Sequence, residues 1–144
     1  YTFCMTKTIF EKIVAGEIPS YKVYEDEHTC AFLDINPNSV GHTLVIPKKP
    51  FKNIHEMPDE VAAALIKTVK KIADAVKITT KADGIKLIMN NGAAAGQEIF
   101  HAHMHIIPRH EHDAVASGRH LKYKTGEADE ILQKIVANIG VEMK

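Results

Sequence analysis

The 144-residue sequence contains no tryptophan, only two cysteines and no excess of charge of either sign, because 18 basic residues balance 18 acidic ones. A balanced charge gives no basis for broad electrostatic attraction to nucleic acid or to an anionic membrane. No apolar run is long enough to span a bilayer, and no signal-peptide pattern is visible. We therefore expect neither a nucleic acid nor a membrane as a partner.

The two cysteines, Cys4 and Cys30, do not form a C-x-x-C pair. A disulfide framework is not expected, and a reducing cytoplasm is the simplest compartment. Cys30 lies in an apolar segment, which predicts a small buried hydrophobe. Met5 is a candidate natural start, so we expect residues 1–7 to be a leader or expression remnant and residues 8–144 to form a single domain.

Hydrophobic periodicity predicts helices and strands in separate groups. Thr8 and Glu11 form a capping-box pattern at the start of a short helix that Gly16 can end. Apolar residues at steps of three and four predict a long helix over 58–78 and a C-terminal helix over about 128–139. Strands are expected at 21–26, 29–35, 42–47 and 84–90, and around the histidines described next. This grouping favours an α+β fold with an antiparallel sheet.

The stretch "FHAHMHIIPR", residues 100–109, alternates three histidines with apolar residues. In a strand this alternation places His101, His103 and His105 on one face and Ala102, Met104 and Ile106 toward a core. We expect Pro108 to end the strand, because proline cannot donate a ladder hydrogen bond. The pattern alone leaves a metal site and a catalytic histidine equally open, and unrelated surface histidines are the weakest interpretation.

Other segments offer polar groups that function or local structure explains equally well. Asp34 ends an apolar strand, where a carboxylate can accept ribose hydroxyls or form a turn. His42 begins a strand, and Asn90 and Asn91 lead into the loop "GAAAGQ". That loop lacks the lysine of a P-loop and by itself is a weak phosphate-binding signal.

Taken together, the segments resemble the histidine triad (HIT) family. Residues 101–107 match its signature, His-φ-His-φ-His-φ-φ, where φ is apolar. Further segments match in the family's order, from about Thr8 to Arg109: "TIFEKIVAGEIPSYKVYEDE", "AFLDINP", "GHTLVIPKK" and "NNGAAAGQ". The closest resemblance is to the Hint-type and bacterial HIT-like branch.

The resemblance implies a HIT-like fold, in which an antiparallel sheet is combined with a long central helix, a short N-terminal helix and a C-terminal helix. It also implies that the protein forms a homodimer. It further implies that His103 attacks the α-phosphorus of a nucleoside phosphoramidate of the AMP-amine type. Water then cleaves the covalent nucleotidyl-histidine, so that one difficult displacement becomes two easier ones. His105 is expected to contact the phosphate or leaving group, His42 to lie near the phosphate, and His101 to support the nucleophile through its carbonyl.

The resemblance also implies the nucleotide-binding residues, here for a purine nucleotide such as AMP. Asp34 is expected to hold the ribose hydroxyls. Apolar side chains are expected to enclose the base, at Phe10, Ile13, Ile18, Phe32 and Ile35. The phosphate end is expected at Asn90, Gly96, Gln97 and Glu98.

Three departures from the family pattern modify these expectations. Bacterial members often hold a structural zinc with a C-x-x-C in the first helix and a histidine after "PKK", but those positions are Thr8, Glu11 and Pro50. We therefore predict no structural zinc and no cofactor, because too few donors are present. Glu98 replaces a hydroxyl side chain beside Gln97, where a carboxylate would repel phosphate. The chain also lacks the C-terminal tryptophan of the Hint branch.

The leading interpretation is a purine nucleotide hydrolase or transferase that cleaves nucleoside phosphoramidates. One alternative is a diadenosine polyphosphate hydrolase, as in the Fhit-like branch, and another is a nucleotide-binding regulatory protein with little turnover, which Glu98 favours. A metal-binding protein that uses the three histidines is a further alternative. The sequence does not specify the physiological substrate, the leaving group, adenine against guanine, the role of the C-terminal tail or protein partners.

Overall fold

The computed structural model describes residues 7–113 and 120–143, and it contains five strands and three α-helices. The strands are β1 (Lys22–Glu25), β2 (Thr29–Leu33), β3 (Thr43–Pro47), β4 (Gly84–Ile88) and β5 (Met104–Arg109). The α-helices are α1 (Ile9–Val14), α2 (Asp59–Thr80) and α3 (Glu127–Asn138), and two short 3-10 helices are η1 (Ile54–Glu56) and η2 (Ala93–Ala95). The expected helices and strands are all present.

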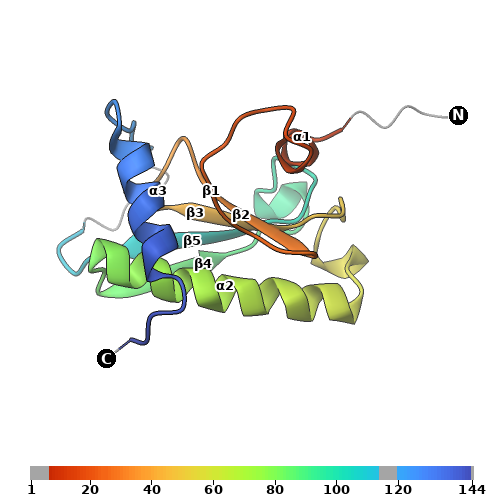
Figure 1. Cartoon of the computed structure of the whole chain (residues 1–144). Coiled ribbons are helices and arrows are strands. Elements are labelled where there is room, and N and C mark those ends of the chain that lie inside the picture. The colour runs from red at the N-terminus through yellow and green to blue at the C-terminus, as the bar shows by residue number, and fades with distance from the viewer. Residues whose placement is uncertain (1–6, 114–119, 144) are drawn as a thin grey trace, which may run out of the picture.

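The five strands form one sheet in the order β1-β2-β3-β5-β4, and every neighbouring pair is antiparallel. The sheet separates two apolar layers, with α2 and α3 on one face and α1 on the other (Figure 1). This arrangement confirms the α+β prediction. Strand β5 lies between β3 and β4, so the strand that carries His105 is inside the sheet and not at its edge.

The larger core lies between the sheet and the two long helices. Leu65, Val69, Ile72 and Val76 project from one face of α2 at steps of four and three, as the periodicity predicted, and all four are buried. Ile135 of α3 completes this layer. A core of this kind, which supplies most of the driving force for folding, holds the sheet rigid beneath the site.

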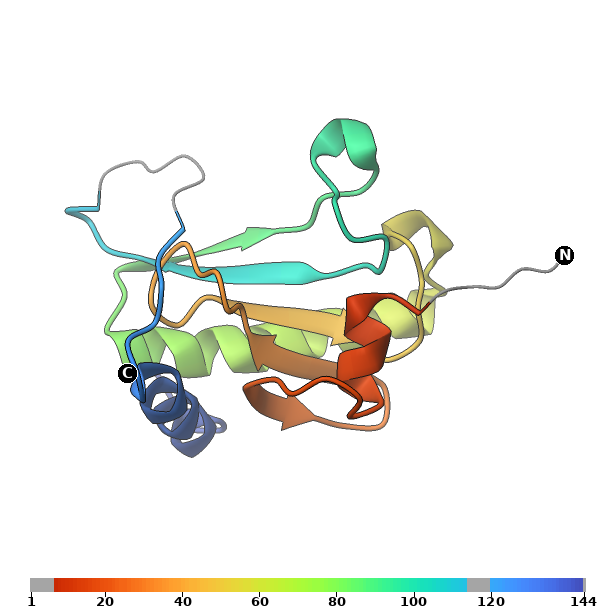
Figure 2. The ribbon, with the colours of Figure 1, turned by 90° about the horizontal axis from the view of Figure 1, so that it is seen from above.

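A smaller apolar cluster covers the opposite face of the sheet. Its buried members are Phe10, Ile13, Cys30, Phe32, Leu44 and Ile46. Helix α1 supplies the first two and lies across one end of β2 and β3 (Figure 2). Because side chains alternate along β2, Cys30 and Phe32 face this cluster while Ala31 and Leu33 face α2. The prediction of a buried Cys30 is confirmed, since none of its surface is exposed.

The start of α1 is the predicted capping box. Thr8 Oγ1 accepts from the backbone N–H of Glu11 at 3.1 Å, and the Glu11 carboxylate accepts from the Thr8 N–H at 3.0 Å. Two backbone donors that a six-residue helix would otherwise leave unpaired are therefore satisfied.

Strand β5 differs from the prediction at both ends. It begins at Met104, so His101 and His103 lie in the segment before it. Pro47 has no N–H to continue the ladder, and its carbonyl accepts from the His101 ring instead.

At its C-terminal end, β5 continues through Pro108 to Arg109. The Pro108 carbonyl accepts from Ser39 Oγ on the side away from β4, so its missing N–H costs no ladder bond.

The expected division into a leader at 1–7 and a domain at 8–144 stays a prediction, because residues 1–6, 114–119 and 144 lie outside the described residues. Cys4 falls among them. In the described part of the chain, no helix combines the length and apolar character needed to cross a bilayer.

Candidate active site

His103 is held by its own backbone neighbourhood. Its Nδ1 lies 2.7 Å from the carbonyl oxygen of His101. A carbonyl only accepts, so Nδ1 carries the proton and Nε2 carries the lone pair. Burial lowers the pKa of His103, although the bond to His101 acts in the opposite direction. The neutral ring with an unprotonated Nε2 is the form that a histidine nucleophile needs.

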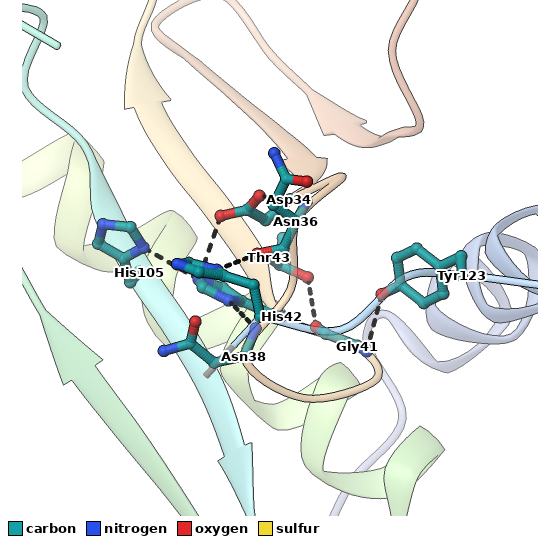
Figure 3. A network of polar contacts seen from close by, with 9 residues as sticks. Asp34, Asn36, Asn38, Gly41, His42, Thr43, His105 and Tyr123 are labelled. Atoms are coloured by element: carbon teal, nitrogen blue, oxygen red, sulfur yellow. Dashed lines mark hydrogen bonds and ion pairs between the residues drawn. The ribbon is translucent and has the colours of Figure 1, made fainter. Parts of the chain in front are cut away.

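His42 lies directly before β3 and is almost fully buried. Its Nδ1 accepts from the backbone N–H of Asn38 at 3.0 Å, so its proton is on Nε2. That Nε2–H donates to Nδ1 of His105 at 2.9 Å (Figure 3). His105 therefore carries its own proton on Nε2, which makes this atom a hydrogen-bond donor.

Both rings of this pair are neutral at pH 7. Burial, with smaller contributions from charge on His105 and His120, lowers the pKa of His42 to about 3. Burial also lowers the pKa of His105 to about 4, with a smaller effect from His103. The His103 and His105 rings meet edge to face with centroids 5.0 Å apart. A ring with a free Nε2 lone pair and a neutral ring with an Nε2–H donor thus lie side by side.

His101 has a different environment from the other two histidines. Its ring is completely buried. Its Nε2–H donates to the Pro47 carbonyl at 2.8 Å, and its Nδ1 lies 3.2 Å from Thr8 Oγ1. His101 lies on the same side as His103, since the Phe10 ring contacts both imidazoles, and Ala102, Met104 and Ile106 pack in the opposite core as predicted. Unlike the other two rings, His101 has both nitrogens bound to protein groups. Its backbone carbonyl, however, is the acceptor for His103, as the resemblance implied.

Asp34 follows β2 and points toward the histidine pair (Figure 3). Its Oδ1 accepts from the Asn36 N–H at 2.8 Å, and its Oδ2 lies 3.6 Å from His42 Nε2. Burial raises the pKa of the carboxyl group, while the Asn36 bond lowers it. The side chain remains 20% exposed, so one carboxylate edge is available to a ligand.

Asp34, His42 and His105 also satisfy the spacing of a metal site, since one ligand atom from each lies within 4.8 Å of the others. A metal on His42 Nε2 needs the lone pair there, but the Asn38 N–H fixes that lone pair on Nδ1. The donor set therefore fits a hydrogen-bonded relay better than an ion. The alternative of a metal held by all three triad histidines does not fit either, because both His101 nitrogens are occupied.

The residues expected to enclose the base divide into two groups. Phe10, Ile13 and Phe32 are buried in the cluster under α1, against which Ile18 packs. The Phe10 ring contacts His103 edge to face, with centroids 5.0 Å apart, so this apolar cluster borders the His103 ring. Ile35 lies outside the cluster and is 63% exposed.

The residues expected at the phosphate end lie in and around the loop that contains η2. Gln97 is buried and holds that loop together: its Oε1 accepts from the Gly92 N–H, and its Nε2 donates to the carbonyls of Lys52 and Ile99. Asn90 approaches the Gly96 carbonyl at 3.5 Å. Gly96 adopts a positive φ of 92°, which favours glycine. Glu98 is exposed, so solvent can screen its charge.

The HIT domain family model matches residues 15–112, which include Asp34, His42 and the three histidines of the signature. The chain belongs to the HIT family. A HIT-like protein of Bartonella henselae described as involved in cell-cycle regulation has the same fold, with a TM-score of 0.84 and 42% identity over 94% of this chain and 99% of that one. The predicted HIT-like fold and family resemblance are therefore confirmed.

Curated HIT relatives include both uncharacterized proteins and enzymes. A HIT-like protein of Methanocaldococcus jannaschii is 49% identical and covers 88% of this chain and 97% of its own length. The adenylylsulfatase HINT3 of Arabidopsis thaliana is 42% identical over 90% of this chain and 66% of its own length. The adenosine 5'-monophosphoramidase HNT1 of Saccharomyces cerevisiae is 41% identical over 72% and 63%.

The structure of this HIT protein adds positioning groups that sequence reasoning missed. Asn38 fixes the proton of His42 through its backbone N–H. The Tyr123 hydroxyl accepts from the Gly41 N–H at 3.0 Å (Figure 3). The Leu121 N–H donates to the Pro37 carbonyl at 2.7 Å. The segment 121–123 thereby holds the loop that carries Asn38. No local pattern signals the two contacts of this segment, because they join residues about eighty positions apart.

Proposed function

We propose that this HIT protein hydrolyses nucleoside phosphoramidates of the AMP-amine type, with His103 as the nucleophile. The observation that carries the proposal is the 2.7 Å bond from His103 Nδ1 to the His101 carbonyl, which leaves the Nε2 lone pair for attack. A lowered pKa keeps that lone pair free at neutral pH.

The proposed reaction has two displacements at phosphorus. The Nε2 lone pair of His103 forms a bond to the α-phosphorus as the P–N bond of the substrate breaks. The amine departs with the electron pair and takes a proton from solvent. Water then attacks the same phosphorus, loses a proton and displaces Nε2, so that AMP is released and the neutral ring is restored. The net reaction is phosphoramidate and water to AMP and amine.

The other residues have proposed roles that follow from their protons and polarity. His105 Nε2–H donates to a phosphate oxygen as negative charge develops. The His42 Nε2–H holds His105 in that tautomer. The Asp34 carboxylate accepts from the ribose hydroxyls. The apolar cluster of Phe10, Ile13, Ile18 and Phe32, together with the exposed Ile35, encloses the base, and the segment of Asn90, Gly96, Gln97 and Glu98 borders the phosphate.

Two relatives support AMP as the transferred group, because their names specify an adenosine 5'-monophosphoramide and an adenylyl sulfate as the compounds that they cleave. The adenylylsulfatase favours a second candidate substrate for this chain, in which sulfate replaces the amine as leaving group. Both candidates use the same attack on the α-phosphorus, so His103 has the same role in each. A homodimer, implied by the family resemblance, is also proposed and is tested by the molar mass in light scattering.

The test is turnover of a fluorogenic adenosine phosphoramidate and of adenylyl sulfate by the wild type, His103→Ala and His28→Ala. His28 is an exposed histidine in the turn between β1 and β2, so it controls for loss of an imidazole. We expect AMP release by the wild type and His28→Ala, and none by His103→Ala, which still binds AMP. AMP binding without turnover by the wild type would instead indicate a nucleotide-binding regulatory protein.

A further inference from the structure

We infer that Thr8, the N-cap of α1, is a positioning residue for the nucleophile and acts through His101. The structural part of this inference concerns the proton on His103, whereas its effect on turnover rests on the proposed function. The inference rests on three hydrogen bonds, which join Thr8 to His101, the His101 ring to the Pro47 carbonyl, and the His103 ring to the His101 carbonyl.

The first bond joins Thr8 to His101. Thr8 Oγ1 already accepts from the Glu11 N–H at 3.1 Å, and its hydroxyl proton remains available. His101 donates from Nε2 to the Pro47 carbonyl at 2.8 Å, which leaves a lone pair on Nδ1. The 3.2 Å contact is therefore a bond from the Thr8 hydroxyl to His101 Nδ1.

Burial makes this bond consequential. The His101 side chain has no exposed surface, so water does not replace a lost partner without entering the protein. The ring is held at one nitrogen by β3 and at the other by α1. With both nitrogens fixed, the orientation of residue 101 and of its carbonyl is fixed as well.

The carbonyl of His101 is in turn the group that orders His103. It accepts from Nδ1–H at 2.7 Å and so places the His103 lone pair on Nε2. The Phe10 ring, two residues from Thr8, contacts both imidazoles, with centroids 5.7 Å from His101 and 5.0 Å from His103. The start of α1 therefore contacts both histidines at once, and displacement of one is transmitted to the other.

The capping role and the positioning role use different parts of the Thr8 hydroxyl. The cap uses an oxygen lone pair, and the bond to His101 uses the proton. Serine retains both, valine removes both, and glycine removes the proton donor but begins a helix nearly as well as threonine. Glu11→Ala removes the other half of the capping box and leaves the Thr8 hydroxyl in place. These four variants separate helix stability from positioning.

The experiment uses the full chain and ¹⁵N NMR of the histidine rings, followed by steady-state kinetics with the adenosine phosphoramidate. In the wild type we expect His103 to show the Nδ1–H tautomer alone. In Thr8→Val and Thr8→Gly we expect a mixture of tautomers and a fall in kcat of roughly tenfold with KM changed less than about twofold, because orientation rather than binding is lost. Thr8→Ser is expected to restore the wild-type values.

Glu11→Ala is expected to lower thermal stability and leave the His103 tautomer unchanged. The inference is overturned if folded Thr8→Gly or Thr8→Val keeps the wild-type tautomer, or if Glu11→Ala changes that tautomer as much as they do. Because the NMR signal needs no substrate, an inactive wild type would contradict the proposed function without affecting this result.

Discussion

The Nε2 atom of His42 lies 2.9 Å from the Nδ1 atom of His105, and the backbone N–H of Asn38 determines which of them carries the proton. Since Asn38 donates to His42, His42 must donate to His105, and His105 must carry its proton on Nε2. A single backbone amide thus sets the polarity of two imidazoles, and the donor at the end of this relay is neutral.

Removal of His42 is expected to reverse that polarity. In His42→Leu, Nδ1 of His105 loses its donor, and the ring can protonate there instead of on Nε2. Because loss of one preorganised donor typically lowers turnover by about 10² to 10³, we expect kcat/KM to fall by roughly 100-fold. His110→Leu is the matched control, since His110 also forms one hydrogen bond to the main chain, in its case to the Thr80 carbonyl. Activity of His42→Leu within twofold of the wild type would contradict the relay.

Acid is expected to destabilise the protein through the same buried pair. The folded-state pKa values of about 3 for His42 and about 4 for His105 lie below the ordinary 6.5. The folded state therefore binds these protons less readily than the unfolded chain, and the contribution to stability is complete above pH 6.5 and lost as the pH falls toward 4 and 3. Asp34, with its raised pKa, acts in the opposite direction.

Urea denaturation at pH 7, 5.5 and 4.5 measures this dependence. The wild-type free energy of unfolding should decrease steadily across the series. The decrease should be smaller in His42→Leu, which has one titrating group fewer. Equal slopes for the two proteins would show that His42 does not bear the shift.

Enzymatic activity is expected to fall in acid for a second reason, separate from unfolding. Protonation of His103 Nε2 removes the nucleophilic lone pair, and burial places the pKa of His103 below its ordinary 6.5. The acid limb of kcat/KM should therefore have its midpoint below pH 6.5. A pH–rate profile checks this, with circular dichroism at each pH to exclude unfolding. An acid limb centred above 6.5 would indicate that another group titrates.

Asp34 is expected to discriminate ribose from deoxyribose. Asp34→Asn retains an oxygen for the Asn36 N–H but removes the charge that strengthens bonds from hydroxyls. Calorimetry should show that the wild type binds AMP about 10 to 100 times more tightly than dideoxy-AMP. The variant should bind both with similar affinity. If the wild type does not distinguish the two ligands, Asp34 does not contact the ribose.

Tyr123 is expected to stabilise the loop that carries Asn38. Tyr123→Phe removes the acceptor of the Gly41 N–H, and an unsatisfied buried donor costs about 1–3 kcal/mol. Gly41 is buried, so water does not readily replace the lost acceptor. Chemical denaturation measures the loss. The control is Tyr24→Phe, at the β1 edge of the sheet, whose hydroxyl donates to Asp26 and accepts from Lys71. An equal loss of unfolding free energy in Tyr123→Phe and Tyr24→Phe would contradict a special role for Tyr123.

Local signals predicted most of the fold. The capping box at Thr8 and Glu11 requires only four consecutive residues, and the apolar face of α2 requires only its own periodicity, so both were predictable. The start of β5 was not, because it depends on Pro47, more than fifty residues earlier, whose carbonyl binds the His101 ring. Strand ends of this kind are decided by the neighbouring strand and not by the strand itself.

The sequence predicted which residues belong to the candidate site but not how their side chains are arranged. Family resemblance implied that His42, His103 and Asp34 belong to one site. In the structure Asp34 Oδ2 lies 3.6 Å from His42 Nε2, and Asp34 is near enough to His103 for its charge to act on that ring. The resemblance could not indicate that both nitrogens of the His101 ring are bound to protein groups or that Gln97 binds its own loop. The partners of His101 and Gln97 depend on which backbone carbonyls are left unpaired once the sheet has formed. The amino-acid sequence does not show which carbonyls these are.

The groups that fix the imidazole protons are mostly main-chain atoms: the carbonyls of His101 and Pro47 and the amide of Asn38. A codon change can replace a side chain, but it cannot delete a peptide carbonyl. Laboratory evolution of this protein can therefore exchange most side chains near the histidines and retain the protonation pattern. The side-chain links at Thr8 and His42 are the exceptions, and elsewhere the pattern changes only when the path of the backbone changes, by insertion, deletion or the transplanting of a whole loop.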